Sequence, residues 1–140
     1  MDDNYVQVFH GLVRETRYSH GYELPQDVEH YVVLLLADHV DRPSWQPQDS
    51  FAETYMRLQD SRSAKQLGDE CLFLCGVFPE YGCRHGLGID YYAGIGSSSY
   101  QRASRDLRRD LFDQLSQQFV VVSRFINATV RGANLRDIYR

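Results

Sequence analysis

Apolar residues recur at intervals of three or four along the last part of this chain. Seven residues keep that spacing, namely Leu107, Leu111, Leu115, Phe119, Val122, Ile126 and Val130. Such spacing places all seven on one face of an α-helix, whereas a half-buried strand would alternate with a period of two. We therefore predict one helix over residues 106–131, about 39 Å long at 1.5 Å per residue. Gly132 is a suitable C-terminal residue for it.

Shorter segments with the same spacing predict five further helices. Two of them are expected over residues 4–18 and 25–41. A short third helix is expected to follow the capping box that Ser50 opens, and a fourth to run from the similar signature at Ser63 to about residue 78. The fifth is expected over residues 89–103. The unbroken apolar run Val32–Ala37 predicts that the second helix is central in the fold. Residues 39–41 at its end are expected to be a solvated cap region.

No segment alternates convincingly, so the predicted fold class is all-α. We expect a compact single-domain bundle of five to six helices over residues 1–140, with a long C-terminal helix. A chain of 140 residues is long enough for one core. Gly94 and Gly96 within the fifth helix predict the close approach of a neighbouring helix, and the tail after Gly132 has enough apolar residues to dock on the bundle.

Charge and hydropathy exclude several kinds of partner. Fifteen basic and nineteen acidic residues give a net charge of −4, so no basic surface for nucleic acid is expected. The longest apolar run, Tyr31–Ala37, has seven residues, far fewer than the ~20 that cross a bilayer. The first residues are acidic, unlike an export signal. These features predict a cytoplasmic protein without nucleic-acid or membrane partners.

The cysteines form the only cluster of soft metal ligands. Cys71, Cys75, Cys83 and His85 are four potential ligands, the number that zinc takes. Their spacing matches no common zinc motif, and Cys71 falls on the apolar stripe of its helix, so core packing is the favoured interpretation. Because the number of cysteines is odd, free thiols are expected. We predict no cofactor and keep a metal-binding protein as an alternative.

Tyrosine is the most unusual residue type of the chain, with ten copies. Tyr81, Tyr91, Tyr92 and Tyr100 flank a glycine-rich connection that contains Arg84 and His85. If the four rings meet at a crevice, they could bind a small molecule, with Arg84 or His85 as a polar anchor. If they face outward, they could bind a protein. If they face inward, they fill the core.

No catalytic constellation is found. The segment Gly94-Ile95-Gly96-Ser97 resembles a phosphate loop only superficially, because it lacks a preceding strand and the Gly-Lys-Ser/Thr ending. The chain contains no Glu-x-x-His motif of the di-iron bundles. We therefore predict no catalytic residues.

One part of the sequence resembles a known group of proteins. Its residues are Leu67-Gly68-Asp69, Leu72-Phe73-Leu74, Gly76, Phe78-Pro79-Glu80, Asp90-Tyr91-Tyr92, Gly96 and Tyr100. This pattern, over about a quarter of the 140 residues, resembles a group of small uncharacterised bacterial helical proteins. The resemblance implies a bacterial, intracellular, helical protein and assigns no activity or site residue.

The sequence thus leaves three hypotheses of function. The first is a non-enzymatic protein–protein interaction module of a bacterial cytoplasm, which self-associates into a homo-oligomer. The second is a helical domain that binds a small molecule in a tyrosine-lined pocket. The third is a metal-binding protein that uses the Cys/His cluster.

Overall fold

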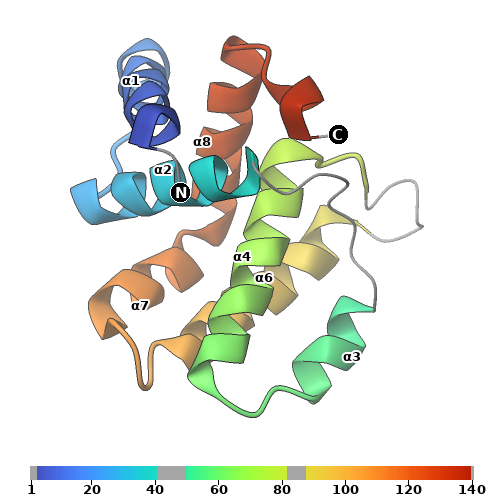
Figure 1. Ribbon diagram of the computed structural model, residues 1–140. Coiled ribbons are helices and arrows are strands. Elements are labelled where there is room, and N and C mark those ends of the chain that lie inside the picture. The colour runs from blue at the N-terminus through green and yellow to red at the C-terminus, as the bar shows by residue number, and fades with distance from the viewer. Residues whose placement is uncertain (1–2, 41–49, 82–87, 140) are drawn as a thin grey trace.

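The computed structural model describes residues 3–40, 50–81 and 88–139, and these residues form an all-α fold (Figure 1). They contain no strand, which confirms the predicted fold class. The elements are α1 (Asp3–His20), α2 (Gln26–Val40), α3 (Phe51–Met56), α4 (Ser61–Val77), α6 (Ile89–Ala103), α7 (Arg109–Gln117), α8 (Phe119–Gly132) and the short 3₁₀ helix η1 (Arg136–Tyr139). The described part therefore has seven α-helices, more than the five to six expected.

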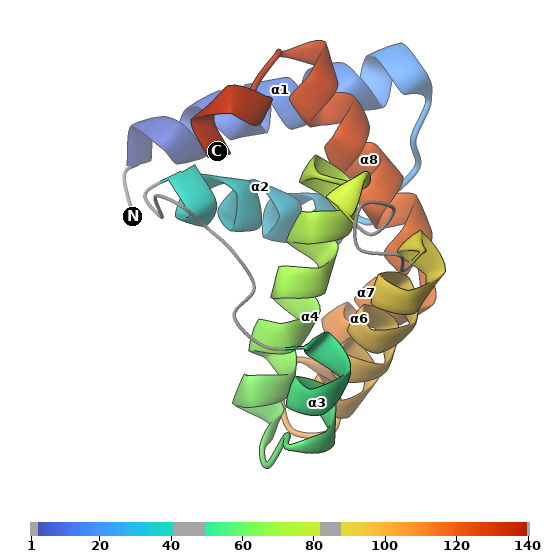
Figure 2. The same ribbon diagram turned by 90° about the vertical axis from the view of Figure 1, so that its right-hand side faces the viewer.

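Helix α4 lies at the centre of the fold, with α6 alongside it and α8 against its C-terminal half (Figure 2). Every residue from Cys71 to Val77 is buried. Helix α2 is also largely buried, but it packs mainly on α1, whereas α4 packs extensively on both α6 and α8. The prediction that α2 is the central helix is therefore wrong. An unbroken apolar run shows that a helix is covered, but several helices can be covered at once.

Two glycines allow the helices around α4 to approach closely. A Cβ atom at Gly96 of α6 would lie 2.4 Å from Cζ of Phe119 and 2.8 Å from Cβ of Cys71. A Cβ atom at Gly68 of α4 would lie 2.7 Å from the ring of Tyr100. The prediction of close approach is thus confirmed for Gly96. Gly94 has open space around it and needs another explanation.

The C-terminal helix is two helices, contrary to the single helix predicted over residues 106–131. Gln118 leaves helical geometry, with φ −106° and ψ 22°, and separates α7 from α8. The apolar face continues across the bend, since Leu115, Phe119 and Val122 are all buried. The bend lets α7 pack on α6 while α8 packs on α4. One non-helical residue does not disturb the spacing of apolar residues, and the sequence pattern therefore concealed it.

The start of α4 also differs from its prediction. Asp60, rather than Ser63, is the N-cap, and its Oδ1 accepts a hydrogen bond of 2.7 Å from the backbone N–H of Ser63. Asp is as good an N-cap as Ser, and this one lies three residues earlier. The cap predicted for α3 is confirmed, because Oγ of Ser50 accepts from the N–H of Glu53.

The tail docks on α2, as its apolar residues predicted. Tyr139 is buried, and its hydroxyl donates a 2.9 Å hydrogen bond to the carbonyl of Leu36. The ring of Tyr139 also contacts Phe73, against which His39 stacks with ring centroids 4.0 Å apart. His39 is only 3% exposed, so the prediction of a solvated cap region is wrong at this residue. Asp41 lies outside the described residues.

Candidate functional site

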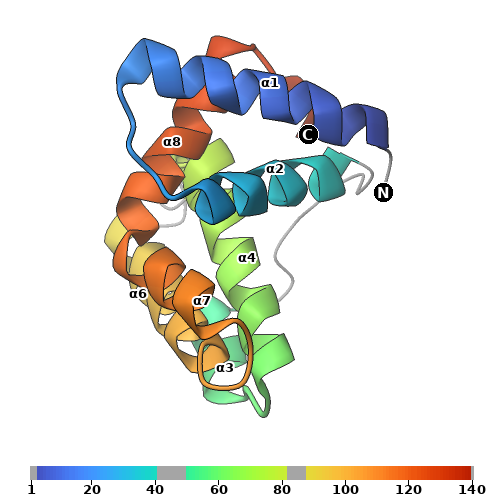
Figure 3. The same ribbon diagram turned by 90° about the vertical axis from the view of Figure 1, so that its left-hand side faces the viewer.

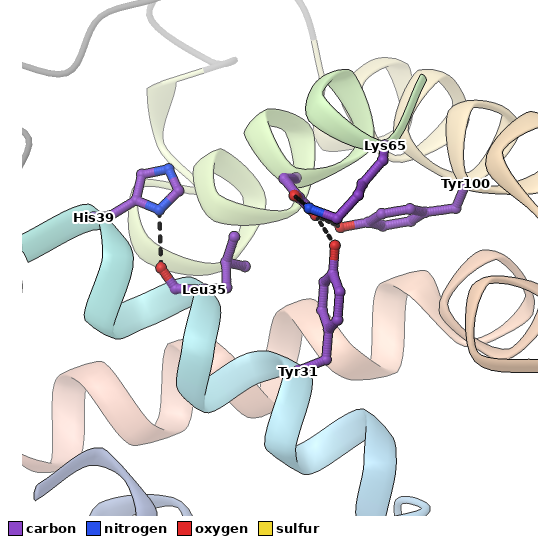
Figure 4. Close-up of polar contacts among 6 residues, drawn as sticks. Tyr31, Leu35, His39, Lys65 and Tyr100 are labelled. Atoms are coloured by element: carbon purple, nitrogen blue, oxygen red, sulfur yellow. Dashed lines mark hydrogen bonds and ion pairs between the residues drawn. The ribbon is translucent and has the colours of Figure 1, made fainter. Parts of the chain in front are cut away.

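A network of polar side chains joins α2, α4 and α6 (Figure 4). The hydroxyls of Tyr31 and Tyr100 both donate to Oδ1 of Asp69, at 2.5 Å and 2.7 Å. The ammonium of Lys65 donates to Oδ2 of Asp69 at 3.0 Å. Figure 4 shows Tyr31 from α2, Lys65 from α4 and Tyr100 from α6 pointing toward one another. One carboxylate thus connects three helices.

Local sequence explains part of this network. Lys65 and Asp69 are four residues apart on α4, so they lie one turn apart on the same face of the helix. Gly68, which precedes Asp69, leaves room for the Tyr100 ring against the backbone of α4. Without that space the Tyr100 hydroxyl could not approach the Asp69 carboxylate so closely.

Burial keeps the two tyrosines protonated. It is the largest cause of the raised pKa of both Tyr31 and Tyr100, and the negative charge of Asp69 raises each pKa further. Both hydroxyls are therefore hydrogen-bond donors at neutral pH. An ionised carboxylate offers about four acceptor positions. Three donors occupy Asp69, so its Oδ2 can accept one more.

The network borders a cleft between α2 and α4 with a volume of about 550 Å³. This volume falls within the ~300–1,000 Å³ usual for small-molecule sites. The side chains around it include three carboxylates, one ammonium and several apolar groups: Tyr31, Leu34, Leu35, Asp38, His39, Lys65, Gln66, Asp69 and Glu70. Among the described residues around the cleft, carboxylates thus outnumber ammonium groups.

The four tyrosines singled out in the sequence do not form one group. Tyr92 contacts Tyr81 and Tyr91, with ring centroids 6.1 Å and 4.9 Å apart. The hydroxyl of Tyr91 accepts a hydrogen bond from the N–H of Ala52 at the start of α3.

Tyr100 is two helical turns beyond Tyr92 on α6, about 12 Å along the axis. It is fully buried against Tyr31, Phe112 and Phe119. Its hydroxyl belongs to the Asp69 network. Arg84 and His85, the expected anchors, lie outside the described residues, so the four-tyrosine pocket stays a prediction. Because Tyr100 is fully buried, it does not line an open pocket.

Two members of the proposed Cys/His cluster are core residues. Cys71 and Cys75 are free thiols that are 0% and 4% exposed. Burial raises the pKa of Cys71 strongly and that of Cys75 to about 12, which makes both poor nucleophiles. Cys83 and His85 lie outside the described residues. Within the described ranges, no three or more His, Cys, Asp or Glu side chains are grouped to hold a metal ion.

Sequence reasoning did not identify Tyr31, Lys65 and Asp69 as site residues. One signal was visible: the only lysine of the chain stands four residues before an aspartate. Tyr31 and Tyr100 are 38 and 31 residues from Asp69 in the chain, and no spacing rule connects them to it.

Comparisons with known protein families, with curated proteins and with solved structures find no match. The resemblance of residues 67–100 to small bacterial proteins therefore stays a prediction. In the part of the chain that the structure describes, none of the helices is both long enough and apolar enough to cross a bilayer.

Proposed function

We propose that this protein is a small-molecule-binding domain whose α2–α4 cleft takes a small organic cation, an amine or a guanidinium compound. One observation carries the proposal: Lys65 places its ammonium 3.0 Å from Oδ2 of Asp69 and 5.6 Å from the centre of the Tyr31 ring. A carboxylate close to the face of an aromatic ring is a favourable environment for an ammonium group. The chain's own lysine occupies that environment.

Asp69 and the Tyr31 ring can bind an external cation in the same way. The side chain of Lys65 is 40% exposed and long, so its ammonium can leave the cleft. Asp69 can accept another donor, and Asp38 and Glu70 add negative charge around the same cleft. Leu34 and Leu35 offer apolar contact to the hydrocarbon part of a ligand. The ligand would compete with Lys65 for Asp69.

This competition gives a directional test. Lys65→Met removes the competing ammonium and keeps the length of the side chain, so we expect it to tighten binding of 1,4-diaminobutane and butylguanidine about tenfold, as for one charge-assisted hydrogen bond. Asp38→Asn and Glu70→Gln should weaken binding. The measurement is isothermal titration calorimetry, with butyrate as an anionic control ligand.

Asp110→Asn is the matched control, because it removes one negative charge from an exposed position on α7. It should leave the affinity unchanged. The proposal fails if neither cation binds at millimolar concentration, or if Lys65→Met weakens binding as Glu70→Gln does.

We also propose that the protein self-associates through the outer face of α1. Tyr5 and Val8 lie three residues apart on this helix and are 36% and 57% exposed. Exposed apolar neighbours on one helix face favour contact with another protein surface. Light scattering at tens of micromolar should give a dimer or larger. Val8→Asp should give a monomer, while Met56→Asp, at a still more exposed apolar position on α3, should not.

We infer that the protein is located in a reducing cytoplasm. The support is that Cys71 and Cys75 are unpaired thiols, which suits a compartment that keeps cysteine reduced. Alkylation of the denatured protein, taken directly from lysed cells, should label both residues.

A further inference from the structure

A second polar region lies between α1 and α2, which run side by side (Figure 3). His10 of α1 and His30 of α2 face each other there. Nε2 of His10 is 3.2 Å from Nδ1 of His30, and the two rings stack with centroids 5.2 Å apart. The two residues are 20 positions apart in the chain, and only the packing of α1 on α2 brings them together.

The separation of the two nitrogen atoms matches that of two ligands on one metal ion. Zinc binds imidazole nitrogen at about 2.0–2.1 Å. Two such ligands on a tetrahedral ion are about 3.3–3.4 Å apart, and two neighbouring ligands on an octahedral ion are about 2.9 Å apart at the same bond length. The observed distance lies between these values, and the two rings, whose planes are 21° apart, would turn so that the lone pairs of both nitrogen atoms point at one ion.

The surroundings allow a cation and water to enter. The histidine pair is exposed and borders an open depression of about 600 Å³. Two arginines and two carboxylates also border it, and both carboxylates are paired, since Arg17 lies 3.2 Å from Glu29 and Arg108 lies 3.9 Å from Asp27. Asp27 precedes His30 by one helical turn. The formal charges of the four groups that border the depression cancel, and Arg108 adds a positive charge beside Asp27, so the two imidazole nitrogen atoms rather than the surrounding charge would hold an ion.

We propose that His10 and His30 together bind one divalent transition-metal ion, such as Zn²⁺ or Ni²⁺, with water completing its coordination. Imidazole suits both ions. The ion would connect α1 to α2 and stabilise the folded chain, because the two nitrogen atoms are adjacent only in the folded state. With two protein ligands the site binds more weakly than a four-ligand structural zinc site. It is distinct from the α2–α4 cleft and does not depend on its function.

Calorimetric titration of the untagged, chelator-treated full chain with ZnCl₂ and with NiCl₂ tests the proposal. We expect one ion per chain and a Tm that rises with the logarithm of ion concentration above the Kd. His10→Asn and His30→Asn should each abolish both effects. His20→Asn, which replaces an exposed histidine at the end of α1, should abolish neither.

Two further measurements separate this site from others. Binding that persists in His10→Asn or His30→Asn, but is lost in Cys83→Ser or His85→Asn, would overturn the proposal and favour the Cys/His cluster. Electron paramagnetic resonance of the wild-type chain with one equivalent of Cu²⁺ requires no variant to fold. A signal with two coordinated nitrogen atoms supports the proposal, and one with fewer contradicts it.

Discussion

Helix α2 makes different kinds of polar contact on two of its sides. Toward α4 and α6, Tyr31 donates to Asp69, whose side chain is only 15% exposed and has two further donors. Toward α1, the contacts are an ion pair between Arg17 and Glu29 and the exposed pair of His10 and His30. The first set is enclosed by aromatic rings. In the second set Arg17 and the histidine pair reach water, whereas the side chain of Glu29 is only 11% exposed.

This difference determines what each contact can do. A buried carboxylate that loses its partners keeps the full cost of its desolvation, so the Asp69 network fixes how three helices pack. Exposed polar pairs contribute little to stability, since water replaces a lost partner. The α1 side of α2 can therefore exchange its contacts for a bound ion, while the network on the α4 side can change only at its exposed edge, where Lys65 lies.

The largest effect is expected from removal of the carboxylate at the centre of the network. Asp69→Ala leaves the buried hydroxyls of Tyr31 and Tyr100 without their acceptor, and we expect a loss of about 3–5 kcal/mol in the free energy of unfolding. Urea denaturation measures it. Asp110→Ala, on the exposed face of α7, should change stability by less than about 0.5 kcal/mol. A loss below about 1 kcal/mol for Asp69→Ala would contradict a structural role of the network.

A smaller effect is expected from filling the space beside Asp69. Gly68→Ala introduces a Cβ atom 2.7 Å from the Tyr100 ring, which must then move. Overpacking of this kind costs about 1–3 kcal/mol. Gly94→Ala is the matched control, because its Cβ atom meets open space on α6.

The control should stabilise the protein by about 0.5–1 kcal/mol, since alanine is the better helix former. Thermal unfolding compares the two variants. Equal shifts of Tm in the same direction would show that Tyr100 does not need the space at Gly68.

The stability of the protein at high pH depends on its buried tyrosines. The unfolded chain loses its tyrosine protons above about pH 10, whereas burial raises the pKa of Tyr100 and Tyr31 and keeps them protonated in the folded state. The unfolded state then binds fewer protons, so stability decreases as pH rises above 10, by about 1.4 kcal/mol per pH unit for each such group.

Tyr100→Phe removes one of these groups. It should cost about 1–2 kcal/mol at pH 7, because one hydrogen bond to Asp69 is lost. It should also make the decrease of stability above pH 10 less steep. Urea midpoints at several pH values, together with tyrosinate absorbance at 295 nm, measure both effects. An unchanged slope would mean that Tyr100 already ionises in the folded protein.

The smallest effect is expected on the α1 side of α2. Arg17→Ala removes the 40% exposed partner of a Glu29 side chain that is 11% exposed, and we expect a loss of about 1 kcal/mol, since water can take the place of the guanidinium. Added salt should reduce this loss further, because it screens exposed charges. A loss comparable with that of Asp69→Ala would show that both sides of α2 are held equally firmly.

The part of the fold that could be predicted is the part that depends on neighbouring residues. The apolar spacing identified the buried face from Leu111 to Val130 correctly, although Leu107, the first residue of the predicted stripe, is half-buried and precedes α7. The stripe through Cys71 placed that thiol in the core. The residues of the candidate site were harder to predict from the sequence. The sequence shows that Lys65 and Asp69 are four residues apart and so share a helix face. Tyr31 and Tyr100 reach Asp69 only through the packing of α2 and α6 on α4.

The sequence by itself determined that the described chain is helical and which faces of its helices are apolar, because helix periodicity is a local property. Only the tertiary structure decided that α4 is at the centre, that the last helix bends at Gln118, and that His10 meets His30 and Tyr100 meets Asp69. These features depend on the shape of surfaces that are far apart in the chain, such as the space beside Gly68, and no local pattern encodes how two such surfaces fit.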